Sequence, residues 1–187
     1  MIHIAAGTTP FLEALRSEGP APDRARNLEL YAWLVGSWDL DVVGVDRSGA
    51  ERRRAGEWHF GWVLEGRAIQ DVWIVPSRGQ RDGDAVANDH YYGTTLRVYD
   101  PRIDAWHIQY TDPVSQTYLV QTGRSQGQDI VQTGHNSDGA WRWSFREITP
   151  TSYFWQGERS VDAGATWETH LEFRARRADR KVLVGSP

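Results

Sequence analysis

Along most of the chain, apolar and polar side chains alternate at every second residue, which is the period of a β-strand with one buried face. Turn-forming residues interrupt this alternation about every eight to twelve positions. Because almost no helix is available to cover a flat sheet, the strands are expected to close on themselves. The pattern therefore predicts an all-β fold, an antiparallel up-and-down barrel of about ten strands with a short N-terminal helical cap. The expected strands cover residues 37–45, 53–65, 67–75, 91–99, 105–112, 116–124, 128–135, 140–148, 152–161 and 166–176.

Helical spacing is confined to the N-terminal part of the chain. Residues 11–15 suggest one weak turn, which ends at Gly19 and the proline after it. A second helix is expected after Asp23, whose side chain can cap it, and Gly36 marks its end. The apolar face of this helix carries Leu28, Tyr31 and Leu34.

The alternation also predicts which side chains point into the barrel. On several strands large rings occupy one face and polar residues the other, and no second layer of structure is expected to cover the outside. The rings should therefore face the interior. The inward residues expected on these strands are Trp58, Phe60, Trp62, Leu64, Trp106, Ile108, Tyr110, Trp141, Trp143, Phe145, Trp167, Thr169, Leu171 and Phe173. The outward residues opposite them include His59, His107, His170 and Glu172.

Length and charge limit the class of protein. At 187 residues the chain suits one domain, which we divide into an N-terminal extension with a capping helix (1–35), a barrel (36–176) and a basic tail (177–187). The net charge of −4 argues against a nucleic-acid partner held through phosphates. No apolar run approaches the ~18 residues of a membrane span. The N-terminus lacks a basic and apolar leader, so a cytoplasmic protein is expected.

Two residue types restrict the chemistry. The chain has no cysteine, which removes thiol nucleophiles, disulfides and thiolate metal sites. Its single lysine, Lys181, lies in the tail, which argues against a Schiff-base mechanism on a buried amine. We expect no metal site and no cofactor.

Aromatic residues are present in excess. Ten tryptophans, seven tyrosines and five phenylalanines exceed what a core of this size needs. They either fill the core or line a cavity, and we favour a cavity because ten strands enclose more room than eight. The residues expected to contact a ligand are Trp58, Phe60, Trp62, Gln70, Arg97, Trp106, Tyr110, Trp143, Trp155 and Arg159.

Two arginines bear on the type of ligand. A buried arginine needs a carboxylate partner or an anionic ligand to offset its desolvation. If Arg97 or Arg159 is inside the barrel, an acid or an enolate is therefore the favoured ligand. The strands at 67–75 and 152–161 alternate poorly, so the facing of Gln70 and Arg159 is left open.

Several short motifs resemble a known architecture. Residues 34–38 (LVGSW) are similar to the Gly-x-Trp opening of the lipocalin-like (calycin) barrels. With residues 60–67 (FGWVLEGR), and with the Tyr-Asp-Pro at 99–101 that precedes Trp106, Tyr110 and Asp112, they resemble family 1579 of the bacterial domains of unknown function over residues 28–176. The chain departs from that family in its longer N-terminal extension and in Glu65, where the family tends to have a second glycine. The resemblance implies a calycin-like barrel of ten strands and supplies no catalytic residues.

The leading functional hypothesis is a binding protein that holds a hydrophobic, planar or aromatic small molecule inside the barrel. A rival hypothesis is a cofactor-free enzyme, such as a cyclase, isomerase or decarboxylase, that works through one phenol and one acid–base group. Its candidate residues are Tyr110, Tyr153, Glu158 and any histidine that proves to point inward.

Two further hypotheses stay open. Some ten-stranded calycin barrels hold haem through a histidine, and His90 and His135, which lie near strand ends, are the candidate ligands here. A structural protein with a filled barrel would lack a pocket and expose tryptophans at an interface. If Trp73 lies on the outside, it would be consistent with a homodimer.

Two segments require interpretation. Residues 123–127 (GRSQG) match the pattern of a nucleophile elbow, which needs a strand followed by a helix. Both flanks have the pattern of strands, so Ser125 is predicted to lie in a hairpin turn. The polar segment 77–88 is interpreted either as a lid over the barrel or as a disordered loop.

Overall fold

The computed structural model describes residues 9–45, 50–81 and 90–178. Within these ranges the N-terminal part forms α1 (Pro10–Leu15), the two-residue strand β1 (Arg16–Ser17) and α2 (Ala25–Ala32). The remaining strands are β2 (Gly36–Val45), β3 (Glu51–Val63), β4 (Ala68–Val75), β5 (Tyr91–Asp100), β6 (Ala105–Asp112), β7 (Thr117–Gln126), β8 (Asp129–Asn136), β9 (Gly139–Arg146), β10 (Ser152–Ser160) and β11 (Glu168–Arg177). A 3-10 turn, η1 (Arg78–Gln80), follows β4.

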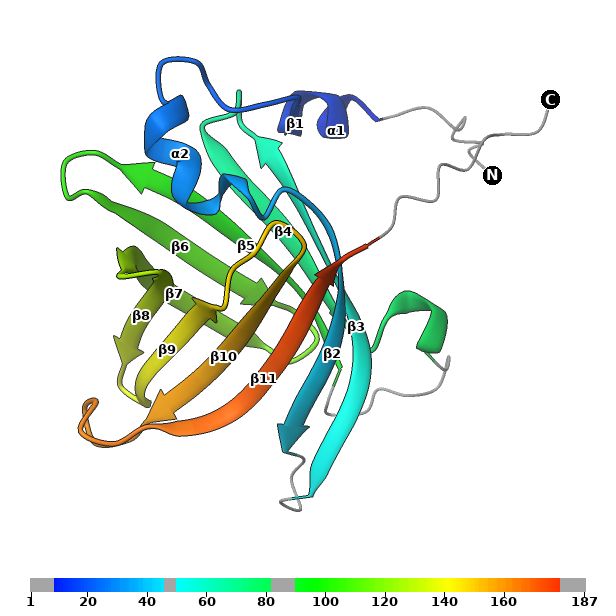
Figure 1. Cartoon of the computed structure of the whole chain (residues 1–187), viewed down its shortest axis with the longest axis vertical. Helices are drawn as coiled ribbons and strands as arrows, with labels where there is room; N and C mark the ends of the chain where they lie inside the picture. Colours follow the sequence, from blue (N-terminus) through cyan, green and yellow to red (C-terminus); the bar gives the residue numbers. More distant parts are fainter. Residues whose placement is uncertain (1–8, 46–49, 82–89, 179–187) are drawn as a thin grey trace.

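These strands form one closed antiparallel barrel (Figure 1). Each of β2 to β10 pairs with the next strand in the chain, and β11 returns to pair with β2, so that ten strands complete the ring. The short β1 adds to one edge, where Arg16 pairs with Val63. The predicted all-β, up-and-down barrel of ten strands is confirmed.

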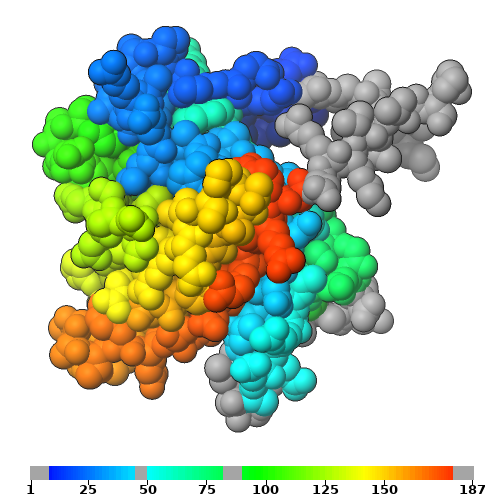
Figure 2. Space-filling view, in the orientation of Figure 1, coloured from blue at the N-terminus to red at the C-terminus, as the bar shows by residue number. Residues whose placement is uncertain are grey.

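Helix α2 covers one end of the barrel, which we call the closed end; β2 begins there (Figures 1 and 2). The predicted apolar face is confirmed, because Leu28, Tyr31 and Leu34 are all within 1% of complete burial. Tyr31 meets Trp106 edge to face, with ring centroids 4.8 Å apart. The indole nitrogen of Trp38 donates to the Leu34 carbonyl oxygen at 2.7 Å. Rings from the helix and the barrel therefore pack this end.

The expected cap of α2 is wrong. The residue at the N-cap position is Arg24, and it makes no side-chain hydrogen bond to the helix. Asp23 instead forms an ion pair with Arg67, between Nη1 and Oδ2 at 3.1 Å. The carboxylate therefore links the helical segment to the start of β4.

The predicted inward facing is confirmed on β3, β6 and β9, where the tryptophans and Tyr110 are buried. Leu64, also predicted to point inward, lies beyond the end of β3 and is 46% exposed. On β11 Leu171 and Phe173 are buried as predicted, but the facing fails at Thr169 and Trp167, because the β10–β11 register shifts between Gly157 and Glu158. Gly157 pairs with Leu171 and Glu158 with Thr169, which leaves His170 as an extra residue without a partner. Such a bulge changes the direction of the side chains beyond it.

Strand β4 corrects two expectations. Its inward residues include Asp71 and Trp73, which are 1% and 4% exposed. Gln70 lies on the outer face, where its amide nitrogen donates to Thr94 Oγ1 at 3.0 Å. Trp73 is therefore inside the barrel, and the argument for a homodimer that rested on an outer Trp73 is lost.

Ser125 lies near the end of β7, one residue before the β7–β8 turn in which Gln126 pairs with Asp129. The strand on each side confirms a hairpin rather than a nucleophile elbow. Of the polar segment 77–88, residues 82–88 lie outside the described residues. The helices that the structure describes are too short and too polar to cross a membrane.

Candidate functional site

A cavity of about 600 Å³ occupies the end of the barrel opposite α2, which we call the cavity end. The β6–β7, β8–β9 and β10–β11 connections lie at this end. Seven of its fifteen lining residues are tryptophan or tyrosine, and the lining comes from β4 to β11 and the connections between them. The lining residues are Trp73, Tyr91, Tyr110, Gln116, Thr117, Tyr118, Leu119, Asn136, Asp138, Trp141, Trp143, Trp155, Arg159, His170 and Leu171.

The aromatic walls are held in place by ring contacts. Trp73 stacks on Tyr91 with ring centroids 5.0 Å apart and an interplanar angle of 7°. Trp155 stacks in the same way on Phe173 at 4.8 Å. Trp143 meets Trp155 edge to face at 5.4 Å. Because each of these lining rings is fixed by another ring, the cavity keeps its shape without a ligand.

Tyr110 places a phenol in the wall. Its ring lies across Gly93 so closely that a β-carbon there would be 2.6 Å from Tyr110 Cε2, so only glycine leaves room for it. The hydroxyl donates to Asp112 Oδ2 at 3.2 Å, while Oδ1 accepts the backbone N–H of Val114 at 2.8 Å. Burial, followed by the negative charge of Asp112, raises the pKa of Tyr110 far above its usual value. The phenol is therefore a neutral hydrogen-bond donor.

Arg159 and His170 stand at the rim of the cavity. Arg159 Nη2 donates to the backbone carbonyl oxygen of Asp138 at 3.2 Å. The bulge turns His170 inward over Gly157, where a β-carbon would lie 3.0 Å from His170 Cε1. Desolvation beside the wall, together with the positive charge of Arg159, lowers the pKa of His170 below its usual value, although the residue is exposed, and Glu158 opposes this shift. The imidazole is therefore neutral near pH 7.

The other candidates for acid–base chemistry are outside the cavity. Glu158 points outward and accepts two hydrogen bonds from Arg142, at 2.7 Å to Nε and 2.8 Å to Nη2. These bonds lower the pKa of Glu158, although its partial burial acts in the opposite sense. Trp167, which the alternation placed inside, instead packs on the outside under the Arg142 guanidinium, 4.3 Å from its ring centroid. Tyr153 is buried among core rings, and burial raises its pKa.

Four of the ten residues predicted to contact a ligand line the cavity. They are Tyr110, Trp143, Trp155 and Arg159. Five others are buried in the half of the barrel nearer α2, namely Trp58, Phe60, Trp62, Arg97 and Trp106. Gln70, the tenth, faces the outside. The alternation predicts that a side chain points inward, but it does not predict whether that side chain lies in the ring-filled half or in the cavity half.

Arg97 lies inside the barrel, but a protein carboxylate balances its charge. Its Nη1 donates to Asp71 Oδ2, and both side chains are completely buried. The guanidinium also lies 5.5 Å from the centroid of the Tyr31 ring and 5.4 Å from that of Phe60. Of the two partners expected for a buried arginine, a protein carboxylate or an anionic ligand, Arg97 has the carboxylate. An anionic ligand is therefore not required there.

Several lining residues were not among the predicted ligand contacts, for different reasons. Trp141 and Leu171 share the predicted inward faces of their strands, so a signal for them was present. Trp73 gave no signal, because both faces of β4 carry apolar residues. The inward turn of His170 depends on a bulge that no residue pattern marks.

The positions of the histidines bear on the haem hypothesis. His59 and His107 are on the outer face, where they hydrogen-bond to Glu57 and Asp100. His135 is exposed on β8, and neither it nor His90 lines the cavity. Among the described histidines, only His170 does. The described residues contain no cluster of three or more His, Asp or Glu side chains that could hold a metal ion.

Solved structures that are similar to this barrel include the following two. The S-type phycobiliprotein lyase CPES from Guillardia theta superposes with a TM-score of 0.57 at 14% identity, over 82% of this chain and 93% of the lyase. Rv2717c from M. tuberculosis superposes with a TM-score of 0.60 at 15% identity, over 86% of this chain and 99% of Rv2717c. The chain shares their lipocalin-like, calycin-type fold. No protein-family model and no curated protein matches the sequence, so the resemblance to family 1579 is not confirmed.

Proposed function

We propose that this protein binds a planar, largely apolar small molecule in the aromatic cavity at the cavity end. The observation that carries the proposal is the contrast between the two halves of one barrel. Near α2 the interior is packed with rings, whereas at the other end rings of the same kind surround about 600 Å³ of space. A cavity of this size lies within the usual range of small-molecule sites, roughly 300–1,000 Å³.

The chemistry of the wall favours a flat molecule. Trp73 with Tyr91, and Trp143 with Trp155, present ring faces and edges from different strands. Such rings gain most from an aromatic or conjugated ligand, which they can contact by offset stacking or edge to face. Polar side chains of the wall, such as Tyr110, Asn136 and Arg159, would orient the ligand between these rings.

The first test is a fluorescence titration with N-phenyl-1-naphthylamine, a neutral planar probe. We compare the native protein with Leu119→Trp, which places an indole in the cavity, and with Val120→Trp. Leu119 lines the cavity, whereas its neighbour Val120 is 67% exposed, so the second variant is a matched control. We expect saturable binding of one probe per chain, a loss of about tenfold or more in Leu119→Trp, and no change in Val120→Trp. Equal effects of the two variants, or no saturable binding, would overturn the proposal.

Native mass spectrometry of the freshly purified protein, with an absorption spectrum, is the second test. A small apolar molecule that the native protein retains and Leu119→Trp loses would support the proposal. A Soret band that His170→Ala abolishes would replace it with haem binding, since a neutral imidazole is the form that ligates iron.

A cofactor-free enzyme is the second candidate function, favoured by the Tyr110–Asp112 pair at the cavity. Tyr110 gives its single O–H to Asp112, so its phenol oxygen could accept a hydrogen bond from a substrate donor, and His170 could accept a proton. Any organic acid or ketone found to bind is incubated with the protein in D₂O and followed by NMR. Deuterium incorporation or loss of carbon dioxide that requires His170 would support catalysis, and an unchanged ligand would reject it.

A further inference from the structure

We infer that the ligand is an organic anion, whose flat body occupies the aromatic cavity and whose acidic group is held at the rim by Arg159 and His170. This inference rests on the proposed function and names the class of molecule that the same site selects. It follows from how the charged groups are distributed between the two halves of the barrel and around the rim.

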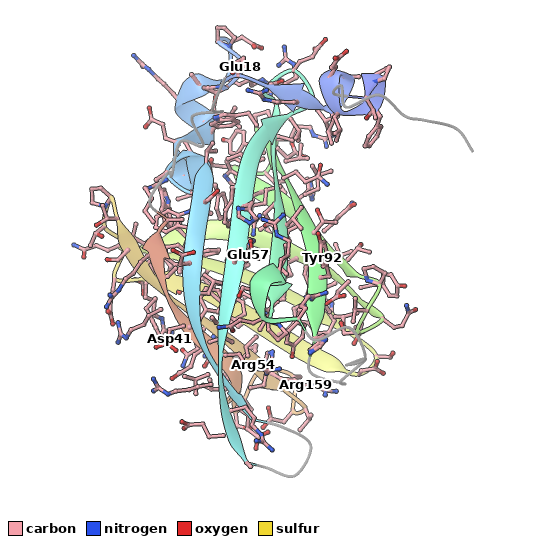
Figure 3. The ribbon with its side chains drawn as sticks, turned by 90° about the vertical axis from the view of Figure 1, so that its right-hand side faces the viewer. Glu18, Asp41, Arg54, Glu57, Tyr92 and Arg159 are labelled. Atoms are coloured by element: carbon pink, nitrogen blue, oxygen red, sulfur yellow. The ribbon has the colours of Figure 1, made fainter. Side chains whose placement is uncertain are left out.

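Arg159 reaches the rim of the cavity with most of its hydrogen-bond donors unused. It lies on β10 directly across from Trp141 of β9, so its side chain enters the rim beside an aromatic lining residue. Among the described residues, the Arg159 side chain makes one hydrogen bond, to a neutral acceptor, the carbonyl oxygen of Asp138. Figure 3 shows Arg159 at the lower end of the barrel, far from the N-terminal segment that carries Glu18. A guanidinium has five N–H donors, so most of its capacity to bind an oxyanion is unused here.

The carboxylates near Arg159 do not neutralise it. Glu158, the preceding residue, is on the other side of the sheet and is bound by Arg142. Glu168 lies opposite Arg159 in the strand register, but the two charged groups form no ion pair. Asp138 offers Arg159 its backbone carbonyl, and its carboxylate accepts the Ser137 hydroxyl at 3.3 Å. No described carboxylate is therefore within ion-pair distance of this guanidinium, in contrast to Arg97, which is paired with Asp71.

His170 and Arg54 lie at the same end of the barrel as Arg159. His170 lies close enough to feel its charge, and both line the same cavity. Arg54 adds a second guanidinium at this end of the barrel (Figure 3). Arg54 lies near the lining residue Leu171, because both side chains reach the same point above Gly44. A β-carbon on Gly44 would lie 3.7 Å from Arg54 Nη2 and 2.8 Å from Leu171 Cδ1. The rim thus combines positive charge with hydrogen-bond donors next to apolar rings.

This arrangement suits an acid in one orientation. The ring system would enter between the tryptophans, and the oxyanion would stay at the rim, where it is only partly desolvated. A charge-assisted pair with a planar guanidinium is stronger than a neutral hydrogen bond and can be bidentate. The reverse orientation would bury the anion beside Tyr110 and the Asp112 carboxylate, which repels it.

The experiment uses two probes that differ by one acidic group. 1-Anilinonaphthalene-8-sulfonate carries a sulfonate on the same frame as the neutral N-phenyl-1-naphthylamine. Both are titrated into the native protein, Arg159→Gln and Arg176→Gln. Arg176 is an exposed arginine on the outer face of β11, so its variant matches the charge change without touching the cavity. Melting temperatures confirm that each variant is folded.

We expect the anionic probe to bind the native protein about tenfold more tightly than the neutral one. Arg159→Gln should remove this preference and leave the neutral probe unchanged, and Arg176→Gln should change neither affinity. If the neutral probe binds in the cavity but the anionic probe has no preference, or keeps it in Arg159→Gln, the inference fails while the proposed function stands. If neither probe binds, both are overturned.

Discussion

Arg97 and Asp71 form an ion pair that is completely enclosed in the half of the barrel nearer α2, with neither side chain exposed to solvent. Asp71 also accepts the backbone N–H of Thr95 at 3.0 Å, and aromatic rings surround the guanidinium. The pair thus lies inside the aromatic core, where an unpartnered charge would be costly.

Removing one partner of this pair should be much more damaging than removing both. We expect Asp71→Ala to lower the free energy of unfolding by about 3–5 kcal/mol, because the Arg97 charge would stay buried without a carboxylate. The double variant Asp71→Leu with Arg97→Met should recover most of that loss. Urea unfolding of the single and double variants measures both values. A double variant as unstable as Asp71→Ala would show that the pair itself, rather than the orphaned charge, determines stability.

Gly93→Ala should disturb the cavity wall through Tyr110. The added methyl group would lie 2.6 Å from the Tyr110 ring, so the ring must move and its bond to Asp112 must lengthen. We expect a loss of about 1–3 kcal/mol in stability together with weaker probe binding. The control is Gly61→Ala, because nothing lies within 4 Å of a β-carbon at Gly61. Thermal unfolding and the naphthylamine titration measure the two effects, and equal behaviour of the two variants would contradict the prediction.

The Glu57–Arg78 contact should make stability sensitive to acid. Partial burial alone would raise the pKa of Glu57, but hydrogen bonds from Arg78 and His59 lower it from the ordinary 4.5 to about 2. Because the folded-state value is the lower one, this stabilisation is fully present above pH about 4.5 and is lost as the pH falls toward 2. Arg78 is 60% exposed, so we expect only about 1 kcal/mol from the contact at pH 7.

The measurement is the difference in unfolding free energy between the native protein and Glu57→Gln, taken from pH 7 down to pH 2. Other carboxylates titrate in both proteins and cancel in this difference. We expect the difference to shrink over the acid range. A difference that stays constant with pH would mean that Glu57 acts through packing rather than through its charge.

Trp106 and Trp141 should separate the functions of the two halves. Trp106 is 1% exposed and packs against Tyr31, so Trp106→Ala should cost about 3–5 kcal/mol of stability with little effect on probe affinity. Trp141 lines the cavity, so Trp141→Ala should weaken probe binding by about 1 kcal/mol through the lost ring contact. Calorimetry and the probe titration give both numbers. Weaker binding in the folded Trp106→Ala protein would contradict this division.

The sequence predicted the barrel well because the alternation is strong where one face meets solvent. On β3, for example, Trp58 and Phe60 alternate with Glu57 and His59, and the structure buries the rings and leaves the polar residues outside. A one-residue slip would invert every side chain, so such a strand specifies its own facing. Ten strands and most of their boundaries followed from this rule.

The site could not be predicted to the same extent, because alternation gives facing but not depth. Trp106 and Tyr110 share a face of β6, yet the first is in the ring-packed half and the second lines the cavity. The difference depends on where α2 sits, which is tertiary information. Trp73 was not predicted because the outer face of β4 is also apolar. His170 was not predicted because β11 contains an extra residue at that point.

The bulge at His170 bears on how such a protein could diverge. Deleting His170 would restore the regular β10–β11 register and remove the imidazole from the rim, while the residues on either side of it would keep their strand partners. The ring-packed half, which supplies much of the fold's stability, lies on the other side of that point and would keep its pairing. Descendants of one ancestor could therefore exchange the chemistry at the rim through a single insertion or deletion while inheriting the same scaffold.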